Sequence, residues 1–187
     1  MTTITPDEMK SLETLFMSET GTPSILLMEH AAQGVFAALA RHAPKSARVL
    51  FLCGPGNNGG DGYAAARLWC SGGGQADVWE VTSAVRGDAL TNRTLALLHG
   101  VRVLPSVDAV DVAEHAAVVD ALYGTGLNHA IEGDAAILIH RLNDNPQIPV
   151  IAVDIPSGLD GTTGRALGAD VVRAAETVTF HRIKQGL

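Results

Sequence analysis

Short apolar segments alternate with amphipathic segments along most of the chain. Six apolar runs have the length of strands: residues 49–53, 76–81, 101–104, 116–122, 149–153 and 176–180. Between them, apolar residues recur at helical spacing, most clearly over residues 63–70, 86–99 and 134–142. Strands that alternate with helices are typical of βαβ units, so the pattern predicts an α/β fold with a mostly parallel sheet between two helical layers.

Two more helices are expected before the first strand. Thr5, Pro6 and Glu8 form a strong helix start, with a capping threonine, a proline at the first position and a glutamate three residues after the cap. The apolar face of this helix would consist of Met9, Leu12, Leu15 and Phe16. Gly21 can end it, and Pro23 repeats the start signal for a second helix. We expect both helices to cover a sheet edge or a partner surface.

Composition restricts the class of protein. The 187 residues are 47% hydrophobic, enough for one well-packed domain over residues 1–187. No apolar run is long enough to cross a bilayer, and no secretory signal pattern opens the chain, so no membrane association is expected. The net charge of −7, without a basic stripe, argues against nucleic-acid binding. Cys53 and Cys70 are too few for a disulfide framework, which favours a reducing cytoplasm.

Polar residues and glycines gather where three of the predicted strands end. The loops at residues 54–62, 120–128 and 154–161 each follow the carboxyl end of a strand. In a parallel sheet these ends lie on one edge, where open α/β folds bind their ligands. The three loops are therefore expected to converge on one site, although each loop taken alone has an ordinary structural explanation.

The first loop is rich in glycine and leads into a helix. Residues 54–59 match the dinucleotide pattern G-x-G-x-x-G, in which glycines adopt positive φ or allow close approach of a ligand. The N-terminus of the following helix can bind phosphate through its backbone N–H groups. A single match is weak evidence, because such turns are common. A Walker-type loop is excluded, since no Lys-Ser or Lys-Thr follows the glycines.

The side chains of the three loops suggest two kinds of chemistry. Asn58, Asp120 and Ser157 offer one oxygen-bearing side chain from each loop, which suits a hard and preferably monovalent cation. Hydrogen bonding between the loops explains the same residues almost as well. Asp154 is the best acid/base candidate, although it could also cap its own turn. No covalent nucleophile is suggested, and histidines such as His129 lack metal-ligand spacing.

Taken together, the motifs resemble a known family. The stretches GPGNNGGDGYAAARL, VVDALYGTGLN and AVDIPSGLDGTTG, flanked by LLMEHAA and TVTFHRIKQGL, are similar to those of the NAD(P)H-hydrate epimerases, the YjeF N-terminal domain family. The resemblance implies a Rossmann-like three-layer domain that interconverts the R and S epimers of hydrated NADH or NADPH. It also implies a dehydratase partner that acts on the S epimer, fused to the chain or separate. A homodimer is expected as well, with the N-terminal helix pair as its surface.

The same resemblance assigns residues. It implies substrate contacts from Asn57, Asn58, Gly59, Gly60, Asp61, Gly124, Thr125, Gly126, Leu127, Asn128, His129, Ala130 and Asp154. It implies a potassium ion held by Asn58, Asp120 and Ser157. Asp154 would transfer the proton at C6 of the substrate, and Lys184 is a second catalytic candidate.

Two rival functions and two departures from the family pattern accompany this interpretation. The first rival is a nicotinamide-dependent dehydrogenase that uses residues 54–59 for the cofactor and Glu80 for its ribose. The second is a non-catalytic binding module on the same scaffold. Residues 128–130 are not the usual continuation of the second loop. The sequence also stops soon after Lys184, as expected of a shortened chain or of the front part of a bifunctional one.

Overall fold

A six-stranded parallel sheet forms the centre of the computed structural model, which describes residues 3–187. Its strands are β1 (Arg48–Cys53), β2 (Gln75–Glu80), β3 (Arg102–Val103), β4 (Ala117–Ala121), β5 (Val150–Val153) and β6 (Glu176–Val178). They lie in the order β3-β2-β1-β4-β5-β6, and every neighbouring pair is parallel. All six predicted strands are present. The direction of the strand order reverses between β1 and β4, and ligands bind at such a switch point in open α/β folds.

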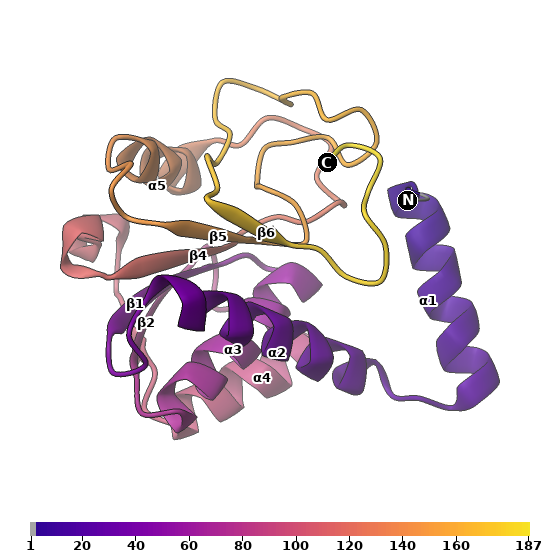
Figure 1. Cartoon of the computed structure of the whole chain (residues 1–187), viewed down its shortest axis with the longest axis horizontal. Helices are drawn as coiled ribbons and strands as arrows, with labels where there is room; N and C mark the ends of the chain where they lie inside the picture. Colours follow the sequence, from indigo (N-terminus) through magenta and orange to yellow (C-terminus); the bar gives the residue numbers. More distant parts are fainter. Residues whose placement is uncertain (1–2) are drawn as a thin grey trace.

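Alternate residues of the strands face two separate cores, and this gives the molecule three layers. In β1, Val49, Phe51 and Cys53 belong to one core, whereas Leu50 and Leu52 belong to the other. The first core is covered by α2 (Ser24–His42), α3 (Asn57–Ser71) and α4 (Gly87–Leu98). The second is covered by α5 (Gly133–Asn143) and two short 3₁₀ helices, η1 (Val107–Ala109) and η2 (Val112–Glu114), which the sequence pattern did not predict. Figure 1 shows α2, α3 and α4 on one side of the sheet and α5 on the other. The predicted three-layer α/β fold is confirmed.

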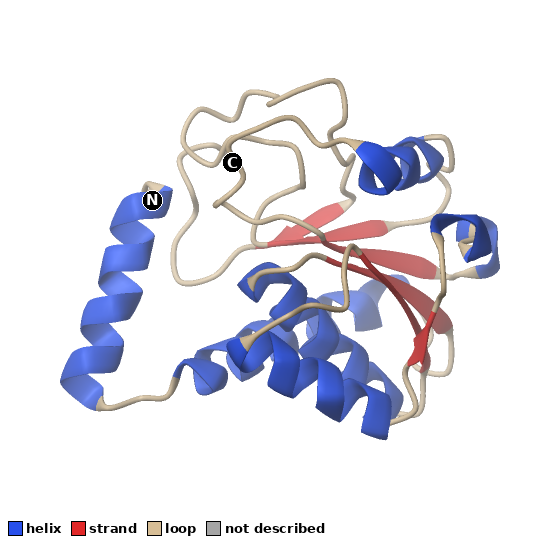
Figure 2. Ribbon diagram, turned by 180° about the vertical axis from the view of Figure 1, so that it is seen from behind, coloured by secondary structure: helices blue, strands red, loops and turns tan. Residues whose placement is uncertain are grey.

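The first helix, α1 (Pro6–Thr20), stands at the end of the molecule rather than on the sheet (Figure 2). Its capping box between Thr5 and Glu8 is formed as predicted, and Gly21 ends it with φ 69°. Met9 is buried, but Leu12, Leu15 and Phe16 are exposed. The predicted apolar stripe therefore exists, yet most of it remains exposed in the part of the chain that is described.

The predicted glycine-rich turn at residues 54–62 is wrong over its second half. Helix α3 already begins at Asn57, with Gly56 as its cap, so Gly59 and Gly62 are helical. None of the glycines in this stretch has a positive φ. Gly59 and Gly62 are needed because neighbours are close: a Cβ on Gly59 would lie 1.9 Å from the Gly54 carbonyl oxygen, and one on Gly62 would lie 2.6 Å from Cβ of Ala121. These glycines bring α3 against β1 and β4.

The structure of residues 3–187 also bears on the cysteines and on the length of the apolar helices. Cys53 lies in β1, Cys70 lies near the end of α3, and neither forms a disulfide. No helix in this range is both long and apolar enough to cross a membrane.

Candidate active site

The three polar loops meet at one pocket of about 580 Å³ at the carboxyl ends of β1, β4 and β5. Ten of the residues named from the sequence line it: Asn57, Asn58, Asp61, Gly124, Thr125, Gly126, Leu127, His129, Asp154 and Lys184. The volume lies in the range of small-molecule sites. The predicted convergence of distant loops therefore holds in the structure.

Four residues expected to contact substrate lie outside the pocket lining. Gly59 and Gly60 are buried in the first turns of α3, where their role is close packing. Asn128 and Ala130 belong to the second loop but are also absent from the lining. The structure therefore gives no support to direct substrate contact by these four residues.

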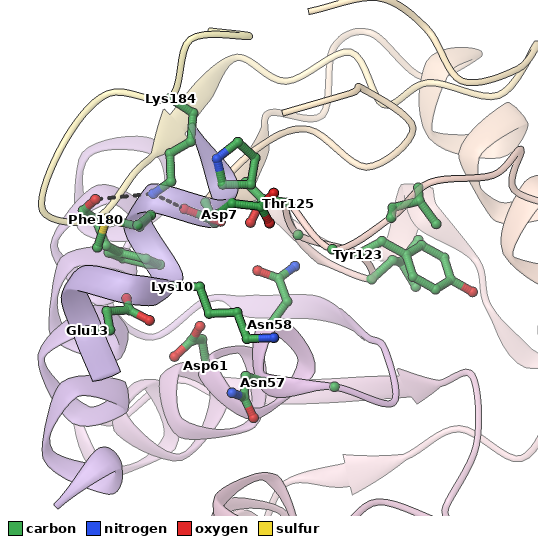
Figure 3. Close-up of a pocket in the computed structure, with 18 of the residues that line it drawn as sticks. Asp7, Lys10, Glu13, Asn57, Asn58, Asp61, Tyr123, Thr125, Phe180 and Lys184 are labelled. Atoms are coloured by element: carbon green, nitrogen blue, oxygen red, sulfur yellow. Dashed lines mark hydrogen bonds and ion pairs between the residues drawn. The ribbon is translucent and has the colours of Figure 1, made fainter. Parts of the chain in front are cut away.

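One wall of the pocket was not foreseen. Pro6, Asp7, Met9, Lys10 and Glu13 of α1 line it, together with Tyr123 and Phe180. Figure 3 shows the polar side chains of α1 facing Asn58 and Asp61 across the opening. A signal was present in the sequence, because Asp7, Lys10 and Glu13 recur every three residues on the face that lies away from the apolar stripe.

The N-terminus of α3 points into the pocket and suits an anionic group. Its cap is Gly56, and no side chain caps this end of the helix. The first backbone N–H groups of a helix have no partner within it, and the helix dipole adds a partial positive charge there. Nearby, the side-chain nitrogen Nδ2 of Asn58 is buried without a hydrogen-bond partner in the structure as described. These donors can bind phosphate oxygens.

Asp154 has the most unusual backbone in the site. It follows β5 directly and has φ 68°, one of only two positive values among the non-glycine residues described. Its N–H donates to the Val178 carbonyl oxygen at 2.8 Å, which fixes it to β6. Strained conformations of this kind persist where the surroundings enforce them, often at functional sites. Here the strained residue is the predicted acid/base group.

Lys184 forms an ion pair with Asp154 and is almost completely buried, with a relative exposure of 2%. Its Nζ also donates to Oγ1 of Thr179 at 3.1 Å. It donates at the same distance to the Phe180 carbonyl oxygen, as Figure 3 shows. The ammonium thus has one ion pair and two hydrogen bonds within the protein. Lys184 is therefore placed to stabilise the negative charge of Asp154.

Asp61 lines the same pocket from the second turn of α3 but has neither an ion pair nor a side-chain hydrogen bond among residues 3–187. Burial raises the pKa of its carboxyl well above the usual value, and the nearby charges of Asp154 and Glu13 raise the pKa further. Lys184 opposes them. The environment therefore favours the protonated form of Asp61.

The three predicted potassium ligands gather behind the second loop. Ser157 donates from Oγ to Oδ1 of Asp120 at 2.6 Å and from its backbone N–H to Oδ2 at 2.8 Å. Ser157 Oγ also accepts from the Tyr123 N–H at 3.0 Å. Asn58 approaches the same loop, since a Cβ on Gly124 would lie 3.2 Å from its Oδ1. The alternative expectation, hydrogen bonding between loops, is thus realised for Asp120 and Ser157.

Asp120 nevertheless lacks a counter-charge. Its side chain has no exposed surface, and no cationic side chain in residues 3–187 pairs with it. Burial raises the pKa of its carboxyl to about 6, although hydrogen bonds from Ser157 and Leu122 lower it. A buried carboxylate surrounded by oxygen donors fits a monovalent cation. No group of three or more His, Cys, Asp or Glu side chains that could hold a metal ion occurs in the same range.

Glu80, the residue that the dehydrogenase alternative needs for the ribose, already accepts hydrogen bonds from other side chains. Its carboxylate accepts from Tyr63 Oη at 2.7 Å and from Nε and Nη2 of Arg93 at 2.7 and 2.8 Å. It does not line the pocket. A ribose would have to displace a two-point arginine pair, so the structure does not favour this rival.

The fold and the pocket define a class: a Rossmann-like α/β domain with an acidic, ligand-sized site at the switch point of its sheet. Comparison with known proteins makes the assignment specific. The family model described as YjeF-related protein N-terminus matches residues 24–186. The chain belongs to this family.

Two relatives and one solved structure illustrate the relationship. The NAD(P)H-hydrate epimerase of Weissella koreensis is 35% identical over 98% of this chain and 82% of its own length. The bifunctional NAD(P)H-hydrate repair enzyme Nnr of Moorella thermoacetica is 38% identical over 98% of this chain, but the match spans only 37% of that protein. The crystal structure of yeast YNL200c superposes with a TM-score of 0.88 at 22% identity, covering all of this chain and 83% of that one, and supports the fold.

Proposed function

We propose that the protein is an isomerase that interconverts the R and S epimers of hydrated NADH and NADPH, and so acts in the repair of nicotinamide nucleotides. The observation that carries the proposal is the Asp154 carboxylate, which stands on a strained backbone and pairs with a buried lysine at a pocket that also receives the N-terminus of α3. The relatives named NAD(P)H-hydrate epimerase support it.

The geometry suits this chemistry. The anionic part of the substrate would lie at the N-terminus of α3, contacted by Asn57 and Asn58, while the ring would lie toward Asp154. The reacting carbon, C6, carries both a hydroxyl group and the ring nitrogen. It can lose its configuration by hydroxide loss or by ring opening, and either route needs proton transfer but no redox partner. Asp154 is the proton-transfer group in this proposal.

Potassium belongs to the proposal. Asn58, Asp120 and Ser157 would hold the ion beside the second loop, where it would supply the positive charge that the buried Asp120 carboxylate lacks. This chain's own residues would then keep the loops at residues 120–128 and 154–161 in the geometry that presents Asp154 to the substrate.

The proposal extends to partners and compartment. A dehydratase would consume the S epimer, and the bifunctional name of the Moorella thermoacetica relative supports a second activity joined to a domain of this kind. Two copies of the chain would pair through the exposed face formed by Leu12, Leu15 and Phe16. The free cysteines Cys53 and Cys70 suit a reducing cytoplasm.

The test is an epimer-equilibration assay. A single epimer of hydrated NADH is mixed with the purified chain, and the approach to the R/S equilibrium is followed by chromatography. We expect clear acceleration by the wild type and a loss of at least about 100-fold in Asp154→Ala, the size of a typical acid/base contribution. Asp108→Ala, at a side chain that is 89% exposed, is the matched control and should remain active.

Three outcomes separate the alternatives. Wild-type protein that does not speed equilibration would support the non-catalytic module. Hydride transfer to or from an added nicotinamide cofactor would support the dehydrogenase. An active Asp154→Ala variant would leave the enzyme assignment standing but remove Asp154 from the mechanism.

A further inference from the structure

Asp61 and Asp154, two of the four carboxyl groups that line the pocket, lie in contrasting environments. Asp154 forms an ion pair with the buried ammonium of Lys184, which also donates hydrogen bonds to Thr179 and Phe180. Asp61 faces the pocket from α3 with no cationic partner and no side-chain hydrogen bond in the described chain. Pairs of this kind, one charged and one kept neutral by their surroundings, mark acid and base roles in enzyme sites.

The charges around Asp61 come from every element that borders it. Glu13 and Asp7 approach from α1 and Asp154 from the end of β5, and all three carry negative charge. Lys184 and Lys10 also line the pocket and are the cationic groups there. Because Lys184 is committed to Asp154, negative charge outweighs positive charge around Asp61. Burial, followed by the charges of Asp154 and Glu13, raises the pKa of Asp61, and this agrees with the geometry.

Building on the proposed function, we propose that Asp61 is the general acid of the epimerisation and delivers a proton to the C6 hydroxyl oxygen of the substrate. Asp154 is its counterpart and accepts a proton from the water that adds back. The reaction then proceeds by hydroxide loss rather than by ring opening.

The proposed steps balance without an additional reactant. The C6–O bond breaks with its electron pair on oxygen, which takes the Asp61 proton and leaves as water. The lone pair of the ring nitrogen forms a double bond to C6, and the positive charge lies between two carboxylates. Water then adds to the other face of C6 and loses one proton to Asp154. The Asp61 and Asp154 carboxyl groups together hold one proton before and after each inversion at C6.

Asp61→Asn tests the assignment. Asparagine has the same shape and can still donate a hydrogen bond, so folding and substrate binding should survive, whereas proton delivery cannot. We expect kcat to fall at least about 100-fold while KM stays within about threefold. In the wild type, kcat/KM should fall as the pH rises and Asp61 loses its proton, and this alkaline limb should be absent in the variant. Asp61→Glu should restore part of the rate, and Glu114→Gln, on the exposed surface, is the charge-matched control.

An isotope measurement covers the case in which the variant fails to fold. Wild-type epimerisation run briefly in ¹⁸O-labelled water should place one solvent oxygen at C6 for each inversion, because the original oxygen leaves as water. Ring opening keeps that oxygen as an aldehyde, so inverted product without ¹⁸O would overturn the proposal. A fully active Asp61→Asn variant would overturn it too, while wild-type protein without any epimerase activity would instead refute the proposed function.

Discussion

Single glycines decide how closely α3 approaches the sheet, and so where the site lies. The Cβ that Gly59 lacks would overlap the Gly54 carbonyl oxygen at 1.9 Å, a contact with backbone that no rotamer change can relieve. A Cβ placed on Gly56, by contrast, would have no other atom within 4 Å. The two neighbouring glycines therefore have different tasks, although the sequence motif treats them alike.

This contrast gives a prediction about stability. Gly59→Ala should lower the free energy of unfolding by about 3 kcal/mol, because overpacking against fixed backbone costs that much. Gly56→Ser should stay within about 0.5 kcal/mol of the wild type or exceed it, since serine caps helices well. Urea unfolding followed by circular dichroism compares the two variants. Equal stabilities for Gly59→Ala and Gly56→Ser would show that the close contact is not a constraint.

At the scale of elements, the two ends of the chain fix each other beside the site. The Ile4 N–H donates to the Ile183 carbonyl oxygen and the Gln185 N–H donates to the Ile4 carbonyl oxygen, both at 3.0 Å. These bonds lie on either side of Lys184, which forms an isolated parallel bridge with Ile4. Pro6 continues the contact, because it packs against Gly161 of the third loop. The N-terminal segment thus holds the backbone from which Lys184 reaches Asp154.

Removing one of these hydrogen bonds should slow the reaction by displacing Lys184. Ile4→Pro deletes the N–H that binds Ile183, whereas Ile4→Ala keeps it and serves as the matched control. We expect kcat for epimerisation to fall at least tenfold in Ile4→Pro, with faster hydrogen exchange at the Gln185 amide, and little change in Ile4→Ala. If Ile4→Pro keeps its kcat while that amide exchanges freely, the segment does not position Lys184.

Glu80, the last residue of β2, has a carboxylate whose contribution to stability depends on pH. Burial raises the pKa of Glu80, but hydrogen bonds from Arg93 and Tyr63 outweigh burial and leave it below its usual value of 4.5. A carboxyl whose folded pKa is lowered contributes stability above its unfolded pKa and loses that contribution as the pH falls through the folded pKa.

Glu80→Gln should therefore lose about 1–3 kcal/mol of stability at pH 7, the value of hydrogen bonds to a charged group. The difference from the wild type should shrink steadily once the pH drops below 4.5. Urea unfolding across that range measures it, with the exposed Glu19→Gln as the control. A difference that stays constant from pH 7 to pH 3 would mean that the charge of Glu80 is irrelevant to folding.

The helices and strands could be predicted from the sequence more fully than the residue contacts in the pocket. The apolar runs predicted all six strands because the central strands β1, β4 and β5 are buried on both faces, although the edge strands β3 and β6 are only partly buried. The capping signals placed α1 because capping is local. The start of α3 at Asn57 was missed because glycine normally interrupts a helix, whereas here close packing of Gly59 and Gly62 requires it. The α1 wall was missed because the sequence does not say where an amphipathic helix will dock.

For the molecule as a whole, the site must hold an anionic substrate although the protein itself is acidic. Asp7, Glu13, Asp61 and Asp154 line the pocket against only Lys10 and Lys184, and the chain carries a net charge of −7. The N-terminus of α3 offers backbone donors without a full charge. A bound cation near the loops would offset part of this excess, and the buried Asp120 lies where such an ion would be most useful.

Potassium should therefore stabilise the entire fold and not only the loops that bind it. If K⁺ at 100 mM is about ten times its dissociation constant, binding adds about 1.4 kcal/mol, which corresponds to a rise of about 4 °C in the melting temperature. Calorimetry in K⁺ against choline at equal ionic strength measures the rise, with Na⁺ as the size control. Asp120→Asn keeps the shape of the side chain but not its charge, and should lose the K⁺-specific rise whatever its own melting temperature. Equal melting temperatures in K⁺ and choline would mean that the loops need no ion, and a full rise in Asp120→Asn would mean that K⁺ stabilises the fold without the charge of Asp120.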